Sequence, residues 1–390
     1  MPGAAKRGQR APAHTGKLDS VQLLRAAAAT LVVLGHIMGA VTRMHADGVR
    51  FVRPDLATGA GVDLFFLISG FIMVVSSGPM FAAADGPRDF LLRRLVRIVP
   101  LYWGVTTLAL VLAMAGRHHA LPGLRAIAAS YGFIPYDTTG RHDGFAFPIV
   151  DLGWTLNYEM LFYVLFASAM RAGRERCVLM VTIALLAMIA LGALWPPRAV
   201  ALQFWTQPIM LEFAAGMGLG LLLVRGRLAL PGAARMALAV AAVAALLWNP
   251  FPALNLPVTP TPNGMERLVG WGLPAAALLA AAISGPLTIR SRLGRMAVVL
   301  GDASYALYLV HPFWLPVLDR ALPFLPAPLC NAWVLIAVAL AGAIVAAVAV
   351  HLRIERPLIR RLTGLLRRRG APIHAVPLVD ATGGDVPPSR

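Results

Sequence analysis

Long apolar runs separated by short polar segments make up most of this chain of 390 residues. A helix needs about 20 mainly apolar residues to cross the hydrocarbon core of a bilayer. Ten runs approach this length, at residues 20–42, 59–78, 96–115, 151–170, 177–195, 208–224, 233–249, 267–284, 301–318 and 331–352. The pattern predicts an all-α fold, a polytopic membrane helix bundle with ten transmembrane helices.

The apolar runs lie within residues 18–360, which we interpret as one transmembrane domain. Residues 1–17 and 361–390 are rich in proline, glycine, alanine and charge, so we expect disorder there. The longest connection on the predicted outer side is residues 116–150. Long loops in compact proteins are usually functional or disordered, and we expect this one to act as a lid or to face an outer substrate.

Composition and charge indicate a membrane protein and exclude a nucleic-acid partner. Hydrophobic residues make up 58% of the chain and charged residues 14%, whereas about a quarter of the residues of soluble proteins are charged. The net charge is +17, but the basic residues are scattered in short clusters between the apolar runs. A nucleic-acid interface would gather them on one face or in one domain.

Lysine and arginine are concentrated on one side of the predicted topology. With a cytoplasmic N-terminus, the inner segments contain about 25 of them and the outer segments about nine, as the positive-inside rule requires. We therefore expect both termini in the cytoplasm and anionic lipid headgroups as default partners of the basic residues. The basic, alanine-rich composition suggests a bacterium of high GC content, and we expect the protein in its inner membrane.

Two ionisable residues interrupt the first apolar run, "VQLLRAAAATLVVLGHIMGAV". Arg25 and His36 are separated by about 20° around a helix and about 17 Å along it, so they share one face. The next run contains Asp63, in "GVDLFFLISGF", at a depth that matches His36. We expect the Asp63 carboxylate to orient the imidazole, which makes His36 a candidate general base.

Further polar residues occupy four other runs. "RRLVRIVPLYW" places Arg93, Arg94 and Arg97 in a predicted inner loop, and the first and last of them are spaced to share a surface suited to phosphate. The remaining candidates lie in "WTLNYEMLFY", "PIMLEFAAGMGLG" and "GDASYALYLVHPF"; they are Glu159 with Tyr163 one turn on, Glu212, and the stripe Ser304, Tyr308 and His311.

Each of these residues also has a plain structural interpretation. Arg25 can act as a topology anchor whose charged end reaches the interface, and the loop arginines satisfy the positive-inside rule without any further role. The histidines and carboxylates can be structural hydrogen-bonding groups. Ionisable residues in membrane helices are nevertheless costly, and they usually face a wet cavity or a functional path.

These motifs, in this order, resemble the acyltransferase-3 family of integral membrane acyltransferases, over roughly residues 18–360. The resemblance extends to the single-domain members that O-acylate exopolysaccharides, O-antigens and related glycans. It implies a ten-helix core, a cytoplasmic acyl-CoA donor and an acceptor that arrives from the outer side. Some relatives carry a fused extracytoplasmic hydrolase-like domain, for which this chain has no room; "LDSVQLLRA" is a looser version of the usual start of the first helix.

The family's functional positions correspond to residues of this chain. Its first-helix arginine and histidine, both central to activity, match Arg25 and His36, and the aspartate after Gly-Val matches Asp63. The arginine before Ile-x-Pro matches Arg97, and the glutamate of the Trp-Thr-Leu motif matches Glu159.

We therefore expect transfer of an acyl group, specifically acetyl, from acyl-CoA to a sugar hydroxyl of a glycan or lipid-linked sugar. Arg25, Arg93, Arg94 and Arg97 would hold the CoA phosphates, and His36 with Asp63 would take the hydroxyl proton. Tyr308, Ser304, His311 and Glu212 are candidates for the oxyanion or the substrate. We expect no metal and no tightly bound cofactor.

The sequence leaves several alternatives open. A covalent acyl-enzyme on His36 or a serine would be an equally good route to the product. A transporter or flippase of a lipid-linked sugar would also keep polar residues at depth, especially with a broken helix. A sensor or scaffold of the cell envelope is a third possibility, although it leaves the histidine and aspartate unexplained. The acceptor and the oligomeric state are undetermined.

Overall fold

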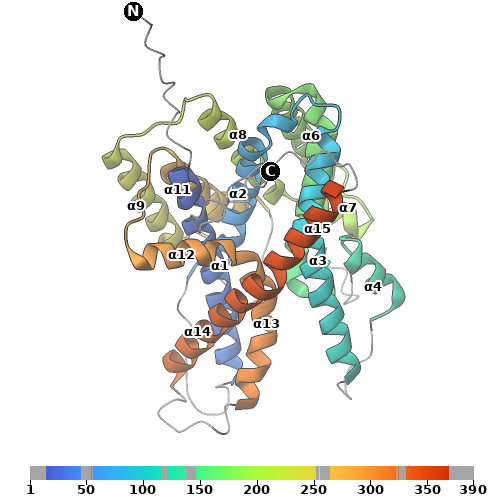
Figure 1. Cartoon of the computed structure of the whole chain (residues 1–390), viewed down its shortest axis with the longest axis vertical. Helices are drawn as coiled ribbons and strands as arrows, with labels where there is room; N and C mark the ends of the chain where they lie inside the picture. Colours follow the sequence, from blue (N-terminus) through green and yellow to red (C-terminus); the bar gives the residue numbers. More distant parts are fainter. Residues whose placement is uncertain are drawn as a thin grey trace, which may run out of the picture.

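The structure, a computed structural model, describes residues 15–44, 54, 56–115, 122–137, 146–251, 254, 264–321, 324 and 331–368. Every regular element of this part of the chain is helical (Figure 1). The predicted disordered segments at 1–14 and 369–390, and parts of the 116–150 loop, lie outside the described residues.

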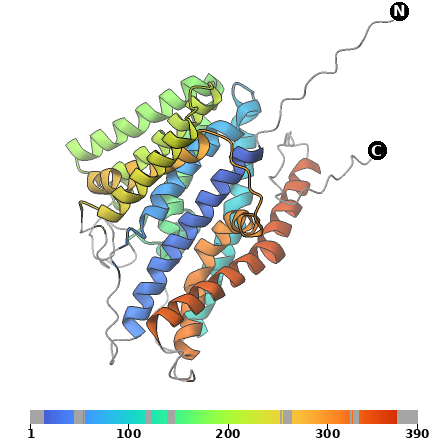
Figure 2. The ribbon, with the colours of Figure 1, turned by 90° about the vertical axis from the view of Figure 1, so that its left-hand side faces the viewer.

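Helix α1 (Thr15–Met44) runs through the middle of the bundle. It contacts α2 (Ala60–Ser76) and α11 (Leu273–Ile283) on one side, and α13 (Ser304–Ala321) and α14 (Ala332–Val350) on the other (Figure 2). Its alanines and valines are buried against these neighbours, including Ala29 and Val33 at 0% exposure. Small side chains let helices approach closely where lipid supplies no hydrophobic driving force.

A second set of helices packs on the other face of α2. Helix α5 (Trp154–Ala169) lies between α3 (Gly86–Ala115) and α6 (Arg174–Leu194), and α8 (Leu211–Val224) contacts both α2 and α6. Aromatic side chains fill the space between them. The Phe213 ring stacks on Phe66 and Phe162, with ring centroids 4.5 and 4.4 Å apart.

Glycines allow α2 and α8 to touch backbone to backbone. A Cβ atom at Gly70 would lie 2.2 Å from the Phe213 carbonyl oxygen, and one at Gly216 would lie 2.0 Å from that of Leu67. No side chain can occupy such a distance without shifting a helix. The small residues that follow Glu212 in the sequence therefore serve close packing.

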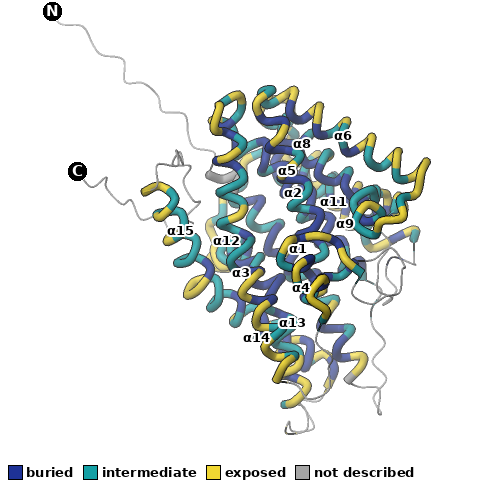
Figure 3. The backbone as a smooth tube through the Cα atoms, turned by 90° about the vertical axis from the view of Figure 1, so that its right-hand side faces the viewer, coloured by how far each residue is buried: buried dark blue, intermediate teal, exposed yellow. Residues whose placement is uncertain are grey.

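The other elements surround this centre and connect it. They are η1 (Gly78–Met80), α4 (Leu124–Tyr131), η2 (Asp151–Gly153), η3 (Met170–Ala172), α7 (Val200–Trp205), η4 (Pro208–Met210), α9 (Gly232–Trp248), α10 (Met265–Arg267), α12 (Arg292–Asp302) and α15 (Arg356–Arg368). Two π-helical segments, η6 (Leu268–Gly272) and η9 (His351–Glu355), join α10 to α11 and α14 to α15. Figure 3 shows that α6, α9 and α15 present many exposed residues, whereas α2 and α5 are largely buried.

All ten predicted apolar runs are helical, and the prediction of a multi-pass helical membrane protein is confirmed. Among the described residues, five helices are long and apolar enough to span a membrane, or six if α12 and α13 form one bent span. Helices such as α2 and α8 are shorter than the hydrocarbon core requires when taken alone. The number of ten spans and the cytoplasmic termini stay predictions; α1 begins and α15 ends at the same end of the bundle (Figure 2).

Four boundaries differ from those predicted. Helix α3 begins at Gly86, so the expected inner loop with its arginines is helical. The 301–318 run is preceded by α12, which meets α13 at an angle of 77°. At the chain's ends, Thr15–Lys17 belong to α1, and α15 extends to Arg368. Arginine and leucine are good helix formers, so charged amphipathic segments such as 86–96 and 356–368 continue the helices beyond their apolar parts.

Candidate active site

A cavity opens between α1, α2, α3, α5 and α13. Its wall is mainly apolar, with Phe65, Phe66, Ile68, Ile72 and Met73 from α2. Six of the predicted site residues line it: Arg25, Arg94, Arg97, Glu159, Ser304 and Tyr308. The other five, His36, Asp63, Arg93, Glu212 and His311, are not among its lining residues.

Three arginines from two helices give one part of this cavity a strong positive charge. Arg25 is 7% exposed, and its guanidinium donates to Ser304 Oγ at 2.9 Å and to Gln22 Oε1 at 3.1 Å. Arg94 lies over the rings of Phe90 and Tyr163, at 5.6 and 5.8 Å from the ring centroids. Such guanidinium groups suit the phosphates of an anionic ligand.

Arg93, which we expected to face the donor together with Arg97, is not among the residues that line the cavity. Arg94, the residue next to Arg93, lines the cavity together with Arg97. Neighbouring residues of a helix point about 100° apart, so only one of Arg93 and Arg94 can face a given direction. The rotation of α3 against α5 selects Arg94.

Glu159 is the carboxylate of the cavity. Its Oε1 accepts hydrogen bonds from Ser69 Oγ at 3.0 Å and from the Tyr163 hydroxyl. The contact with Tyr163 follows from their spacing of one turn on α5. Both donors are neutral, and the lining of the cavity thus combines one carboxyl group with three guanidinium groups.

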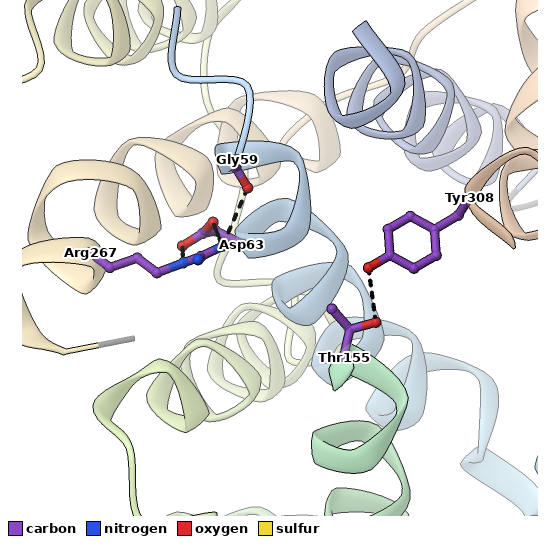
Figure 4. A network of polar contacts seen from close by, with 5 residues as sticks. All are labelled: Gly59, Asp63, Thr155, Arg267 and Tyr308. Carbon is purple, nitrogen blue, oxygen red and sulfur yellow. Dashed lines mark hydrogen bonds and ion pairs between the residues drawn. The ribbon is translucent and has the colours of Figure 1, made fainter. Parts of the chain in front are cut away.

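Tyr308 lies at the part of the cavity away from Arg94. Its hydroxyl donates to the Leu152 carbonyl oxygen at 3.1 Å and accepts from Thr155 Oγ1 at 3.2 Å, and Figure 4 shows the Thr155 contact. Ser304, one turn before it on α13, accepts from Arg25. Both hydroxyls are therefore held in place, and Tyr308 would have to exchange a carbonyl partner to serve an oxyanion.

His36 and His311 form a pair between α1 and α13, with ring centroids 5.1 Å apart. Each Nδ1 contacts the carbonyl oxygen four residues back, Val32 at 2.9 Å and Leu307 at 3.0 Å. Because a carbonyl only accepts, Nδ1 carries the hydrogen and Nε2 is the basic nitrogen of each neutral ring. His36 is exposed, whereas His311 is buried with Nε2 unbonded within the described part of the chain.

The predicted pairing of Asp63 with His36 is also wrong. Asp63 is 0% exposed and receives two hydrogen bonds from Arg267, from Nε at 3.0 Å and from Nη2 at 2.8 Å (Figure 4). A guanidinium matches both carboxylate oxygens, whereas an imidazole could match only one. The carbonyl of Val32 takes the place on His36 that we had assigned to Asp63.

Arg267 was missed by the sequence interpretation, which placed it in an outer loop at the start of the 267–284 run. It is 1% exposed, and its guanidinium also lies over the rings of Trp271 and Trp154, at 5.1 and 5.7 Å. A signal was present, because "MERLVGWGL" places an arginine directly before an apolar run that contains tryptophan. Glu212, also fully buried, lies beside this group against Gly272 and not in the cavity.

Comparison with known proteins identifies the family of this chain. A family described as "Acyltransferase domain", Acyl_transf_3, matches residues 18–352. The chain is 33% identical over 309 residues to "Exopolysaccharide production protein ExoZ" of Rhizobium meliloti (strain 1021), which covers 77% of this chain and 90% of that protein. It is 27% identical over 331 residues to "Acyltransferase MdmB" of Streptomyces mycarofaciens, covering 77% and 79%. No solved structure is significantly similar to the chain.

Proposed function

The chain belongs to the acyltransferase-3 family and is a membrane acyltransferase, and from this premise we propose that it acetylates a bacterial surface glycan. The donor is acetyl-CoA from the cytoplasm, and the acceptor is a sugar hydroxyl of an exopolysaccharide, O-antigen or lipid-linked precursor. The similarity to an exopolysaccharide production protein over 77% of the chain supports this class of acceptor. The proposed location is the inner membrane.

One observation carries the donor assignment. Arg25, Arg94 and Arg97 come from two helices into one cavity whose remaining wall is largely apolar. CoA has several phosphate charges at one end and an uncharged acyl thioester at the other. Charge-assisted bonds from arginine would hold the phosphates, and the thioester would extend along the apolar wall toward Thr155 and Tyr308.

His36 is the proposed general base. With its Nδ1 hydrogen engaged by the Val32 carbonyl oxygen, Nε2 accepts the proton of the sugar hydroxyl. The hydroxyl oxygen then attacks the thioester carbonyl carbon; a C–O bond forms, the C–S bond breaks, and CoA leaves as a thiolate. The proton on His36 passes to the CoA sulfur, so that an ester and free CoA are the products.

The negative charge that develops on the carbonyl oxygen needs a hydrogen-bond donor or a positive charge. Tyr308 and Ser304 line the cavity and are the proposed donors, whereas His311 supports the ring of His36. Arg25 donates a hydrogen bond to Ser304 Oγ, which would make the Ser304 hydroxyl a stronger hydrogen-bond donor. A covalent acyl-His36 intermediate would use the same nitrogen, and it would differ by accumulating before the acceptor is added.

The test is release of CoA from acetyl-CoA by the purified protein in lipid nanodiscs, with acyl-free polysaccharide from a strain that lacks the gene as acceptor. We expect His36→Ala to lower the rate by a factor of about 10² to 10⁴, the usual contribution of a general base. Arg320→Ala is the matched control, because that arginine is exposed and donates to the Pro316 carbonyl oxygen of its own helix.

The outcomes separate the possible functions. A transporter would release no CoA in any variant. Release of CoA without an ester on the polysaccharide would reject the proposed acceptor but keep the donor. Near-normal turnover by His36→Ala would reject the proposed base while leaving the acyltransferase activity intact.

A further inference from the structure

Arg267 binds a part of the protein that the proposed mechanism does not use. Its guanidinium makes two hydrogen bonds to Asp63, at 3.0 and 2.8 Å, and a third to the Gly59 carbonyl oxygen at 3.3 Å. Both charged side chains are sealed from solvent, at 2% and 0% exposure. Figure 4 shows that this contact joins α10 to the first turn of α2.

The same guanidinium reaches α5. It lies 5.7 Å from the ring centroid of Trp154, the first residue of that helix. Cation–π contacts of this kind are strongest where water is excluded. One side chain therefore ties the starts of α2 and α5 to each other.

These two starts form one end of the cavity. Val62 and Phe66, which flank Asp63 on α2, line the cavity, and so does Thr155, which follows Trp154. Tyr163, beside Arg94, is eight residues further along α5, or about 12 Å. Arg267 thus lies behind the Thr155 end, whereas the three cavity arginines occupy the other end.

The residues around Arg267 are shaped for close contact. A Cβ atom at Gly59 would lie 2.3 Å from the Trp271 ring, and one at Gly272 would lie 2.8 Å from Glu212 Oε1. The π-helical segment η6 directly follows Arg267 and contains Trp271 and Gly272. Single-turn π segments often occur at functional sites.

We infer that Arg267 is a positioning residue for the acceptor half of the reaction. Through Asp63 and Trp154 it sets the separation of α2 and α5 at the Thr155 end, where the acceptor hydroxyl must meet the thioester. This inference rests on the proposed function, because it requires the CoA phosphates at the arginine end. Donor binding should then be independent of Arg267, and acyl transfer to the acceptor should depend on it.

Two variants test the inference without relying on a protein that fails to fold. Arg267→Lys keeps the charge but cannot bind both carboxylate oxygens. The double variant Asp63→Asn with Arg267→Gln removes both charges of the pair together, so that neither is left buried without the other. Arg235→Gln is the matched control, since that arginine contacts the carbonyl oxygens of Ala281 and Pro286 at the far end of α11.

For each variant we would measure the thermal midpoint, the Kd of acetyl-CoA, and kcat and KM for acyl-free polysaccharide. We expect folded proteins with an unchanged Kd for acetyl-CoA and a kcat/KM for the polysaccharide lowered about 100-fold, as for a misplaced reacting group. Arg235→Gln should change neither quantity.

Three results would overturn the inference. One is a kcat/KM for the polysaccharide that stays at the wild-type value in both variants. The second is a loss of acetyl-CoA binding as large as the loss of kcat/KM for the polysaccharide. The third is loss of the folded state in both variants. The second and third results would each indicate a general structural role for Arg267. A wild-type protein that binds acetyl-CoA but acylates no polysaccharide would instead overturn the proposed function.

Discussion

Arg25 and Arg267 are both buried arginines within membrane helices, at 7% and 1% exposure, yet their surroundings differ. Arg25 donates to the neutral oxygens of Ser304 and Gln22 and lines a cavity with two further arginines. Two nitrogens of the Arg267 guanidinium donate hydrogen bonds to the two carboxylate oxygens of Asp63, and Arg267 is not among the residues that line the cavity.

The difference concerns what neutralises each charge. A buried charge is tolerated when it is paired and hydrogen-bonded, and it is costly otherwise. Asp63 fulfils this requirement for Arg267 within the chain. Among the residues that line the cavity, one carboxyl group, that of Glu159, accompanies three guanidinium groups, so an anionic ligand would add neutralising charge. The first arrangement holds helices together, and we propose that the second binds the phosphates of the donor.

The largest expected effect is the loss of stability when the buried ion pair of Asp63 and Arg267 is broken. Arg267→Gln leaves Asp63 as an uncompensated buried charge, which should lower the free energy of unfolding by about 3–5 kcal/mol. Denaturation of the protein in detergent, followed by circular dichroism, measures this loss. Arg25→Gln, which leaves only neutral partners behind, should cost clearly less. Equal losses in the two variants would show that the two arginines do not differ in the way described.

The next effect is on donor affinity. Arg25→Gln and Arg97→Gln should each weaken acetyl-CoA binding by about 1.5–3 kcal/mol, the usual strength of hydrogen bonds to charged groups. Titration calorimetry gives the Kd, and higher salt should weaken wild-type binding as well. Arg94→Gln should have a larger effect than Arg93→Gln, because only Arg94 lines the cavity. The reverse order would place the donor elsewhere on α3.

A smaller effect is expected at the cavity carboxylate. Tyr163→Phe keeps the packed ring but removes one of the two donors to Glu159, worth about 0.5–1.5 kcal/mol. We expect this loss in kcat/KM with little change in thermal stability. Ser69→Ala removes the other donor and should behave alike. Unchanged kinetics in both variants would mean that the charge of Glu159 has no part in turnover.

The smallest effect belongs to an exposed arginine. Arg225 pairs with Glu175 at 2.7 Å near the surface, where their side chains are 37% and 64% exposed. Arg225→Gln should change the free energy of unfolding by about 0–1 kcal/mol, because solvent screens such pairs. The same denaturation assay, repeated at high salt, should show the difference vanish. If Arg225→Gln lowered the free energy of unfolding as much as Arg267→Gln, the exposure of an arginine would not predict its contribution to stability.

Much of the fold follows from local features of the sequence. Each apolar run forms a helix, because an apolar environment leaves the backbone no partners except its own carbonyls. Helical spacing also predicted that Tyr163 meets Glu159 and that Arg25 and His36 share a face. Both of the latter do contact α13, Arg25 through Ser304 and His36 through the ring of His311.

The errors concern contacts between helices. Asp63 and His36 were predicted at matching depths, but depth does not tell which neighbour a side chain points to. Arg267, more than 200 residues away in sequence, occupies the position on Asp63. The extra turns of α3 and α15 were missed for a different reason, since the search followed apolar length and charged amphipathic helices continue past it.

The sequence alone determined that this is a polytopic helical membrane protein with ionisable groups at set depths, and its motifs determined the family. Those properties depend on composition and on the 3.6-residue period, which are local. Only the tertiary structure decided that Arg94 and not Arg93 faces the cavity, and that Asp63 pairs with Arg267 and not with His36. Such choices depend on how each helix is rotated against its neighbours, and packing across the whole bundle sets that rotation.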